Sequence, residues 1–159
     1  MKMRCLLFAC VTLVLAGCLG SKPTRYYLLE AEKPAAKASF SLRRLELAAY
    51  LEQNSLIRRC EGKRIEYLEG HTWATGLRRM LEDSLKDALD AKAKRSISLK
   101  IRRFEAADDS KFHVQVEYLE DSGNGEIAFE LPCDSSNPEA IAATANQALA
   151  ELLKRLAAL

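Results

Sequence analysis

The chain has 159 residues, and its 24 Lys and Arg residues against 22 Asp and Glu residues give a formal net charge of +2. Both surplus positive charges, Lys2 and Arg4, lie at the N-terminus, and the rest of the chain is balanced. A neutral domain has no overall attraction for nucleic acid or for an anionic lipid surface, so charge-driven binding to either is excluded.

The first 17 residues have the pattern of a secretory signal peptide. Two basic residues precede an apolar run from Leu6 to Leu15, and the small pair Ala16-Gly17 follows. The alternative, a transmembrane helix, needs ~20 apolar residues, and this run is too short. Cys18 directly after the small pair resembles a bacterial lipobox, in which the cysteine carries acyl chains such as palmitate and becomes the new N-terminus. Because Leu19 rather than Asp follows it, the pattern predicts an outer-membrane anchor with the domain facing the periplasm.

The predicted organisation is a lipidated cysteine with a short tether over residues 18–23 and one domain over 24–159. At ~3.5 Å per extended residue such a tether spans about 20 Å, so the domain must lie against its membrane. Cys60 and Cys133 are the two cysteines of this domain. An oxidising compartment favours a disulfide between them, and two buried free thiols are the alternative.

The N-terminal half predicts strands, a loop and a helical turn. Aromatic and apolar residues indicate the strands, and the phase of alternation slips at Arg43 and Arg44, which indicates a bulge. Glu61-Gly62-Lys63 is typical of a hairpin turn. The predicted ranges are strands 24–29, 40–47, 56–60 and 64–68, a loop at 32–37 and a helical turn at 48–53.

A long helix is predicted next, with Thr72 as its cap and Trp73 as the first residue of its apolar stripe and a core anchor. Strands follow at 97–101, 112–118 and 127–131, with a hairpin loop at 121–125 between the last two. Asn137 and Pro138 predict the start of a closing helix. The order favours an α+β domain in which an antiparallel sheet has two long helices packed on one face.

No catalytic, cofactor or metal-binding constellation is recognisable, and no catalytic or metal-ligating residue is assigned. His113 is out of phase with its apolar neighbours and is expected to face solvent or a partner, and His71 is expected to have a polar role at the helix start. Four Arg-Arg pairs begin at Arg43, Arg58, Arg78 and Arg102. Strand neighbours point to opposite faces, so surface ion pairs are favoured over a basic binding patch.

Partner binding is predicted at the first strand, through Tyr26 and Tyr27, because an unpaired strand edge offers main-chain groups and the tether holds this strand near the membrane. The outward residues of strand 112–118, such as Glu117, are polar and fit a second core poorly.

Several short motifs occur in a fixed order behind the lipobox, and together they resemble the ABC-type transport auxiliary lipoprotein family of the paraquat-inducible type. The motifs are densest around Tyr26-Tyr27-Leu28, Tyr50-Leu51 and Trp73-Ala74, within residues 18 to about 90. The family usually continues Trp-Ala with an acidic residue, Pro and Leu, where this chain has Thr75-Gly76-Leu77.

The resemblance implies a non-enzymatic accessory lipoprotein of an intermembrane lipid transport system. Its partners would be an MCE-domain protein and ABC transporter subunits, which carry phospholipid-like cargo. The lipoprotein would dock the periplasmic component at the outer membrane. It would also assemble into a homo-oligomer. Two alternatives stay open: a lipoprotein that assembles or plugs an outer-membrane barrel, as in lipopolysaccharide export, and a lipid-anchored periplasmic enzyme.

Overall fold

The computed structural model describes residues 23–30 and 38–159, and it confirms an α+β domain. The signal peptide, Cys18 and the loop expected at 32–37 lie outside the described residues. The strands are β1 (Arg25–Tyr27), β2 (Phe40–Leu47), β3 (Ser55–Cys60), β4 (Arg64–Trp73), β5 (Arg95–Ala107), β6 (Lys111–Glu120) and β7 (Gly123–Pro132). The helices are the 3₁₀ turn η2 (Ala49–Glu52), α2 (Leu77–Ala88) and α3 (Pro138–Ala157).

One seven-stranded sheet contains all the described strands, in the order β1-β4-β3-β5-β6-β7, with β2 also paired to β5. The sheet is mixed, so the expectation of an antiparallel sheet was wrong: β1 pairs with β4, and β2 and β3 pair with β5, in parallel. The reason lies in the connections. Between β2 and β5 the chain runs through a hairpin and α2, and such a long crossover permits parallel pairing.

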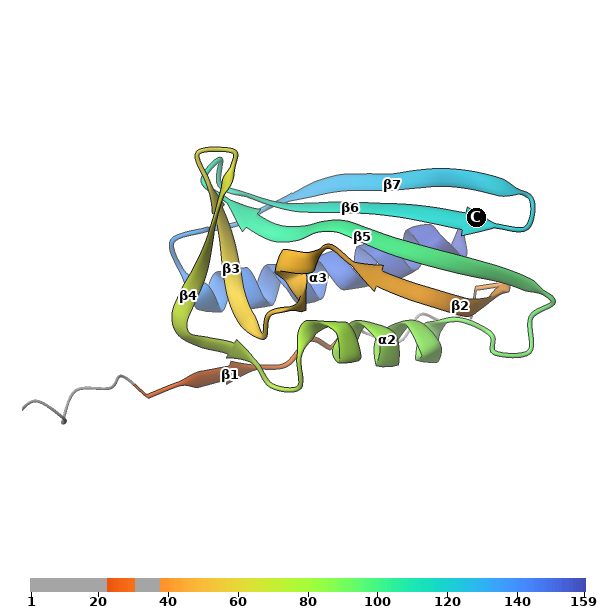
Figure 1. Ribbon diagram of the computed structural model, residues 1–159, viewed down its shortest axis with the longest axis horizontal. Coiled ribbons are helices and arrows are strands. Elements are labelled where there is room, and N and C mark those ends of the chain that lie inside the picture. Colours follow the sequence, from red (N-terminus) through yellow and green to blue (C-terminus); the bar gives the residue numbers. More distant parts are fainter. Residues whose placement is uncertain (1–22, 31–37) are drawn as a thin grey trace, which may run out of the picture.

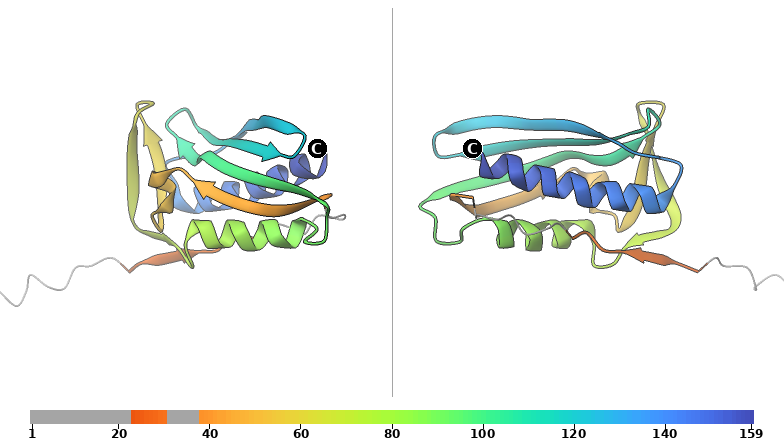
Figure 2. Two further views of the ribbon diagram at one scale, coloured as in Figure 1. Left: turned by 45° about the vertical axis from the view of Figure 1, so that its right-hand side comes forward. Right: turned by 180° about the vertical axis from the view of Figure 1, so that it is seen from behind.

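Both long helices cover the same face of the sheet, as predicted (Figures 1 and 2). Helix α3 lies across β5, β6 and β7, and α2 lies along β2 and next to α3. The core between helices and sheet contains large apolar side chains with almost no exposure, among them Phe40, Leu81, Leu85, Ile101, Phe112 and Leu149. Within the described residues, neither α2 nor α3 lies over the opposite face of the sheet (Figure 2).

Local sequence signals for the turns and caps are confirmed. The β2–β5 register shifts between Leu42 and Arg44, which is the expected bulge. Glu61 and Gly62 have φ of 51° and 70° in the tight β3–β4 turn. The Asn137 side chain accepts hydrogen bonds from the backbone N–H groups of Glu139 and Ala140, and so caps α3.

The start of α2 differs from the expectation. Thr72 and Trp73 belong to β4, where they pair with β1, and α2 begins at Leu77 after Gly76 with no side-chain cap. Gly76 has φ of +84°, and a Cβ there would lie 2.9 Å from Asn54 Oδ1, so this strand-to-helix turn requires glycine. Trp73 is 5% exposed and therefore lies in the core as expected, but from a strand instead of a helix.

Candidate functional site

The segment that follows the predicted tether is built firmly into the domain. The Ala74 N–H donates to the Tyr27 carbonyl at 2.8 Å, and the Glu30 N–H donates to Asn146 Oδ1 on α3 at 2.8 Å. Leu29 is buried, and its N–H lies 3.3 Å from Met80 Sδ on α2. The segment thus contacts β4, α2 and α3, which fixes its position on the domain.

The two tyrosines predicted to bind a partner have different surroundings. The Tyr27 hydroxyl lies 2.7 Å from His71 Nδ1, the two rings stack at 5.8 Å, and Glu139 Oε1 is 3.4 Å away. Partial burial and the Glu139 carboxylate raise the pKa of Tyr27. Tyr26, in contrast, is 68% exposed. Only Tyr26 therefore has a side chain free to meet another molecule.

An exposed apolar surface, Tyr26 with Leu28, lies at this edge of the sheet. Leu28 is 55% exposed, and β1 is the outermost strand of the sheet on this side. Arg25 forms an ion pair with Glu139, whose pKa is lowered first by a hydrogen bond from its own backbone N–H and further by Arg25. The surface can add a strand by main-chain pairing and can bury two apolar side chains.

His71 and His113 both differ from the expectations. His71 lies within β4 and contacts Tyr27, so it has no role at a helix start. His113 is only 8% exposed, which contradicts the expected solvent-facing position. Its Nε2 lies 2.9 Å from Asp109 and its Nδ1 lies 3.2 Å from Glu130, so carboxylates from a turn and from β7 cover the ring.

The arginine pairs form ion pairs, as predicted. Each of the eight arginines contacts a carboxylate, in the pairs Arg43–Asp121, Arg44–Glu46, Arg58–Glu66, Arg59–Glu105, Arg78–Glu52, Arg79–Asp83, Arg102–Glu117 and Arg103–Glu105. One carboxylate among them, Glu105, is fully buried, which the sequence did not indicate.

Cys60 and Cys133 are both free, buried thiols in the structure. The Cys60 thiol donates to Glu66 Oε2 at 3.4 Å. Burial raises the pKa of the Cys133 thiol. In residues 23–30 and 38–159, no group of three or more His, Cys, Asp or Glu side chains is placed to hold a metal ion. None of the helices in this part of the chain is long and apolar enough to cross a membrane.

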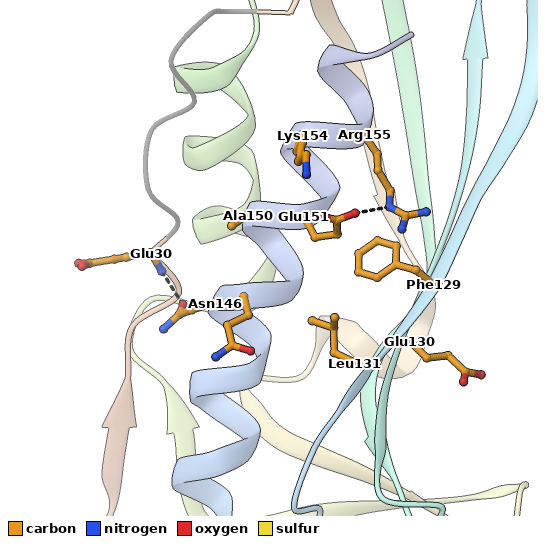
Figure 3. A pocket seen from close by; sticks show the side chains of 10 residues that line it. Glu30, Phe129, Glu130, Leu131, Asn146, Ala150, Glu151, Lys154 and Arg155 are labelled. Carbon is orange, nitrogen blue, oxygen red and sulfur yellow. Dashed lines mark hydrogen bonds and ion pairs between the residues drawn. The ribbon is translucent and has the colours of Figure 1, made fainter.

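A groove of about 590 Å³ runs over the exposed side of α3, from Glu30 to the edge strand β7 (Figure 3). Phe129 and Leu131 project from β7 toward the helix and form its apolar wall. On α3, Arg155 lies over the Phe129 ring at 4.6 Å and donates to Glu151 at 2.7 Å. Sequence reasoning identified α3 and β7 but not this groove, because it depends on how the two elements pack against each other.

The chain matches the ABC-type transport auxiliary lipoprotein component family over residues 27–157, which extends beyond the segment that carries the short motifs. No curated protein sequence matches it. Among solved structures, an uncharacterized protein is similar at a TM-score of 0.67 and 14% identity, covering 86% of this chain and 97% of the other. Protein XCC0632 from Xanthomonas campestris, a DUF330 protein, is similar at a TM-score of 0.60 and 20% identity, covering 84% and 91%.

Proposed function

The chain belongs to the ABC-type transport auxiliary lipoprotein family, and from this premise we propose that it is a non-enzymatic accessory protein of an MCE-type lipid transport system. It would act beside an MCE-domain protein and ABC transporter subunits and hold the periplasmic component at the outer membrane. Its own contribution would be a membrane-anchored docking surface.

The anchor in this proposal is Cys18. Each buried CH₂ of an acyl chain contributes ~0.8 kcal/mol, so several chains make release from the membrane negligible. Only residues 19–24 separate Cys18 from β1, and their extended length is about 20 Å. The partner must therefore reach the domain close to the membrane surface.

One observation supports β1 as the docking element: the segment next to the tether is fixed to the domain, yet Tyr26 and Leu28 remain exposed on it. Exposed apolar side chains on an edge strand are typical of a surface that pairs with another chain. The same surface could serve assembly of copies of this chain into a homo-oligomer.

The test is copurification of the lipidated protein from its own membranes in mild detergent. We compare Tyr26→Asp with Glu117→Lys, a change on the sheet face that neither α2 nor α3 covers. Tyr26→Asp is expected to lose the MCE-domain partner and keep the wild-type melting temperature, since its side chain is exposed. Glu117→Lys is expected to keep the partner. Tyr27→Asp is less informative, because it also breaks the contact with His71.

Equal, intact binding by both variants would place the interface elsewhere. Recovery of an outer-membrane barrel protein in place of an MCE-domain protein would reject the proposed transport system and favour the barrel-assembly alternative.

A further inference from the structure

Strand β7 forms the edge of the sheet opposite β1 and leaves a long stretch of backbone unpaired. All ten of its residues pair with β6 on one side, from Gly123↔Glu120 to Pro132↔Lys111. On the other side, no strand within residues 23–30 and 38–159 pairs with it. Such an edge presents N–H and C=O groups at the spacing that a further strand needs.

The groove of Figure 3 runs along this free edge. Phe129 and Leu131 are half-buried and lie on the same face of β7, two residues apart. A strand added to β7 would place its own alternate side chains, also ~7 Å apart, against these two residues. The groove therefore offers apolar contacts at the period of an extended peptide.

The charges of the groove leave one cation without a counter-ion. Arg155 is paired with Glu151, and Glu130 is paired with Lys111. Lys154 is exposed and has no ion pair or hydrogen bond with any residue in the described part of the chain. The carboxylate of Glu30 lies on the far side of α3 and points away from β7 (Figure 3). An acidic group on the occupant would complement Lys154.

We propose that the β7–α3 groove binds an extended peptide segment of a partner protein by strand addition to β7. The segment presents apolar side chains at alternate positions to Phe129 and Leu131 and an acidic residue to Lys154. A peptide uses both the free backbone edge and the apolar wall, whereas an acyl chain uses only the wall. The inference concerns the sheet edge opposite β1 and does not depend on the transport role.

The first experiment is photo-cross-linking in the cells that make the full-length lipoprotein. A benzophenone amino acid replaces Gln147, which is exposed on the helix side of the groove, and a control places it at Leu119, which is 56% exposed and outside the groove. Position 147 is expected to cross-link to one continuous segment of one partner protein, and position 119 is not. Cross-links only to phospholipid, only to a second copy of this chain, or to nothing would overturn the proposal.

The second experiment tests strand addition with the mapped segment as a synthetic peptide, bound to the full-length protein in nanodiscs. Backbone N-methylation of alternate residues blocks one edge of a strand. One of the two alternate sets is expected to weaken binding more than about tenfold, and the other less than about twofold. Equal effects of the two sets would rule out pairing with β7.

Charge reversal tests the role of Lys154. Lys154→Glu is expected to weaken binding of the peptide roughly fivefold, and a peptide in which its acidic residue is replaced by Lys should restore it. Lys94→Glu, an exposed lysine away from the groove, is the matched control and should leave binding unchanged. Equal weakening by both variants would show a general charge effect and no contact at Lys154.

Discussion

The hydroxyl of Tyr50 lies 2.5 Å from Oε2 of Glu105, a carboxylate with no solvent exposure. Arg59 donates to the other oxygen of Glu105 at 2.7 Å, and Arg103 donates to it at 3.0 Å. The cluster joins η2, β3 and β5. A buried carboxylate is stable only when it is paired and hydrogen-bonded, and here three side chains satisfy it.

Tyr50→Phe is expected to change the response of stability to alkaline pH. Burial, followed by the hydrogen bond to Glu105 and its charge, raises the pKa of Tyr50 above its ordinary value near 10. Below pH 10 the neutral hydroxyl contributes fully to stability. Above pH 10 the unfolded chain ionises while the folded chain keeps its proton, so stability falls as pH rises.

Urea unfolding at pH 7 and at several values between 9.5 and 11 provides the measurement. Tyr50→Phe should cost about 1 kcal/mol at pH 7 and should lose less stability than wild type above pH 10. Tyr67→Phe, an exposed tyrosine, is the control. Parallel pH profiles for wild type and Tyr50→Phe would contradict the assignment.

Trp73→Ala is expected to destabilise the domain by ~3–5 kcal/mol, because it removes a large buried side chain that packs in the core. The melting temperature should fall by more than ten degrees. Tyr67→Ala, on the same strand but 45% exposed, should change it little. An unchanged midpoint for Trp73→Ala combined with loss of the transport partner would instead make Trp73 a partner contact.

Gly76→Ala is expected to cost about 1–3 kcal/mol, because φ of +84° is unfavourable for alanine and the new Cβ would crowd Asn54. Gly62→Ala is the matched control: its φ is +70°, but an added methyl group would meet no atom within 4 Å. Denaturant midpoints of the two variants separate backbone strain from crowding. A smaller loss at Gly76 than at Gly62 would show that Asn54 moves away freely.

Thiol titration of the mature protein without reductant should find two free thiols per chain after unfolding, from Cys60 and Cys133. In the native protein both should react slowly, because each is 7% exposed and burial raises the pKa of Cys133. A count of zero until a reductant is added would demonstrate a disulfide. Cys60→Ser and Cys133→Ser, each leaving one thiol, assign the two reactions.

Cys18→Ala is expected to yield a folded domain that no longer sediments with membranes, since the proposed anchor consists of acyl chains on Cys18. Fractionation of wild type should place the protein with the outer membrane. Cys5→Ala, within the predicted signal peptide, is the control and should leave the location unchanged. Continued membrane association of Cys18→Ala would refute the lipobox interpretation.

Local signals predicted the local features of this fold, whereas pairing over long distances depended on information the sequence pattern lacks. The cap at Asn137 and the bulge at Arg43 and Arg44 involve only neighbouring backbone groups. The residue types at these positions were therefore sufficient to predict both features. The direction of β2 against β5 depends on the route of the intervening chain. Trp73 was assigned to a helix although it is the last residue of β4. Strand β4 leads into α2 and buries Trp73 on the same side as the apolar stripe of that helix.

For the candidate sites, too, local features were predicted and contacts between distant residues were not. Tyr26 was predicted to bind a partner from its place in an edge strand; its side chain is exposed, and partner binding stays a prediction. His113 was misassigned because alternation gives only the face of a strand, and the carboxylates that cover the ring come from the β5–β6 turn and β7. The Glu105 cluster joins side chains that lie far apart in sequence, and no spacing rule brings them together.

Among the described strands β2 pairs only with β5, and this has a consequence for the order in which the chain can fold. A chain that emerges N-terminus first can form the β3–β4 hairpin and add β1 to it as soon as Trp73 is available. Strand β2 must wait for β5, so Phe40, Leu45 and Leu47 have no strand partner until Arg95 and the residues after it arrive. Over that interval the backbone of β2 is unpaired, which makes this apolar stretch a site where another chain could pair and start aggregation.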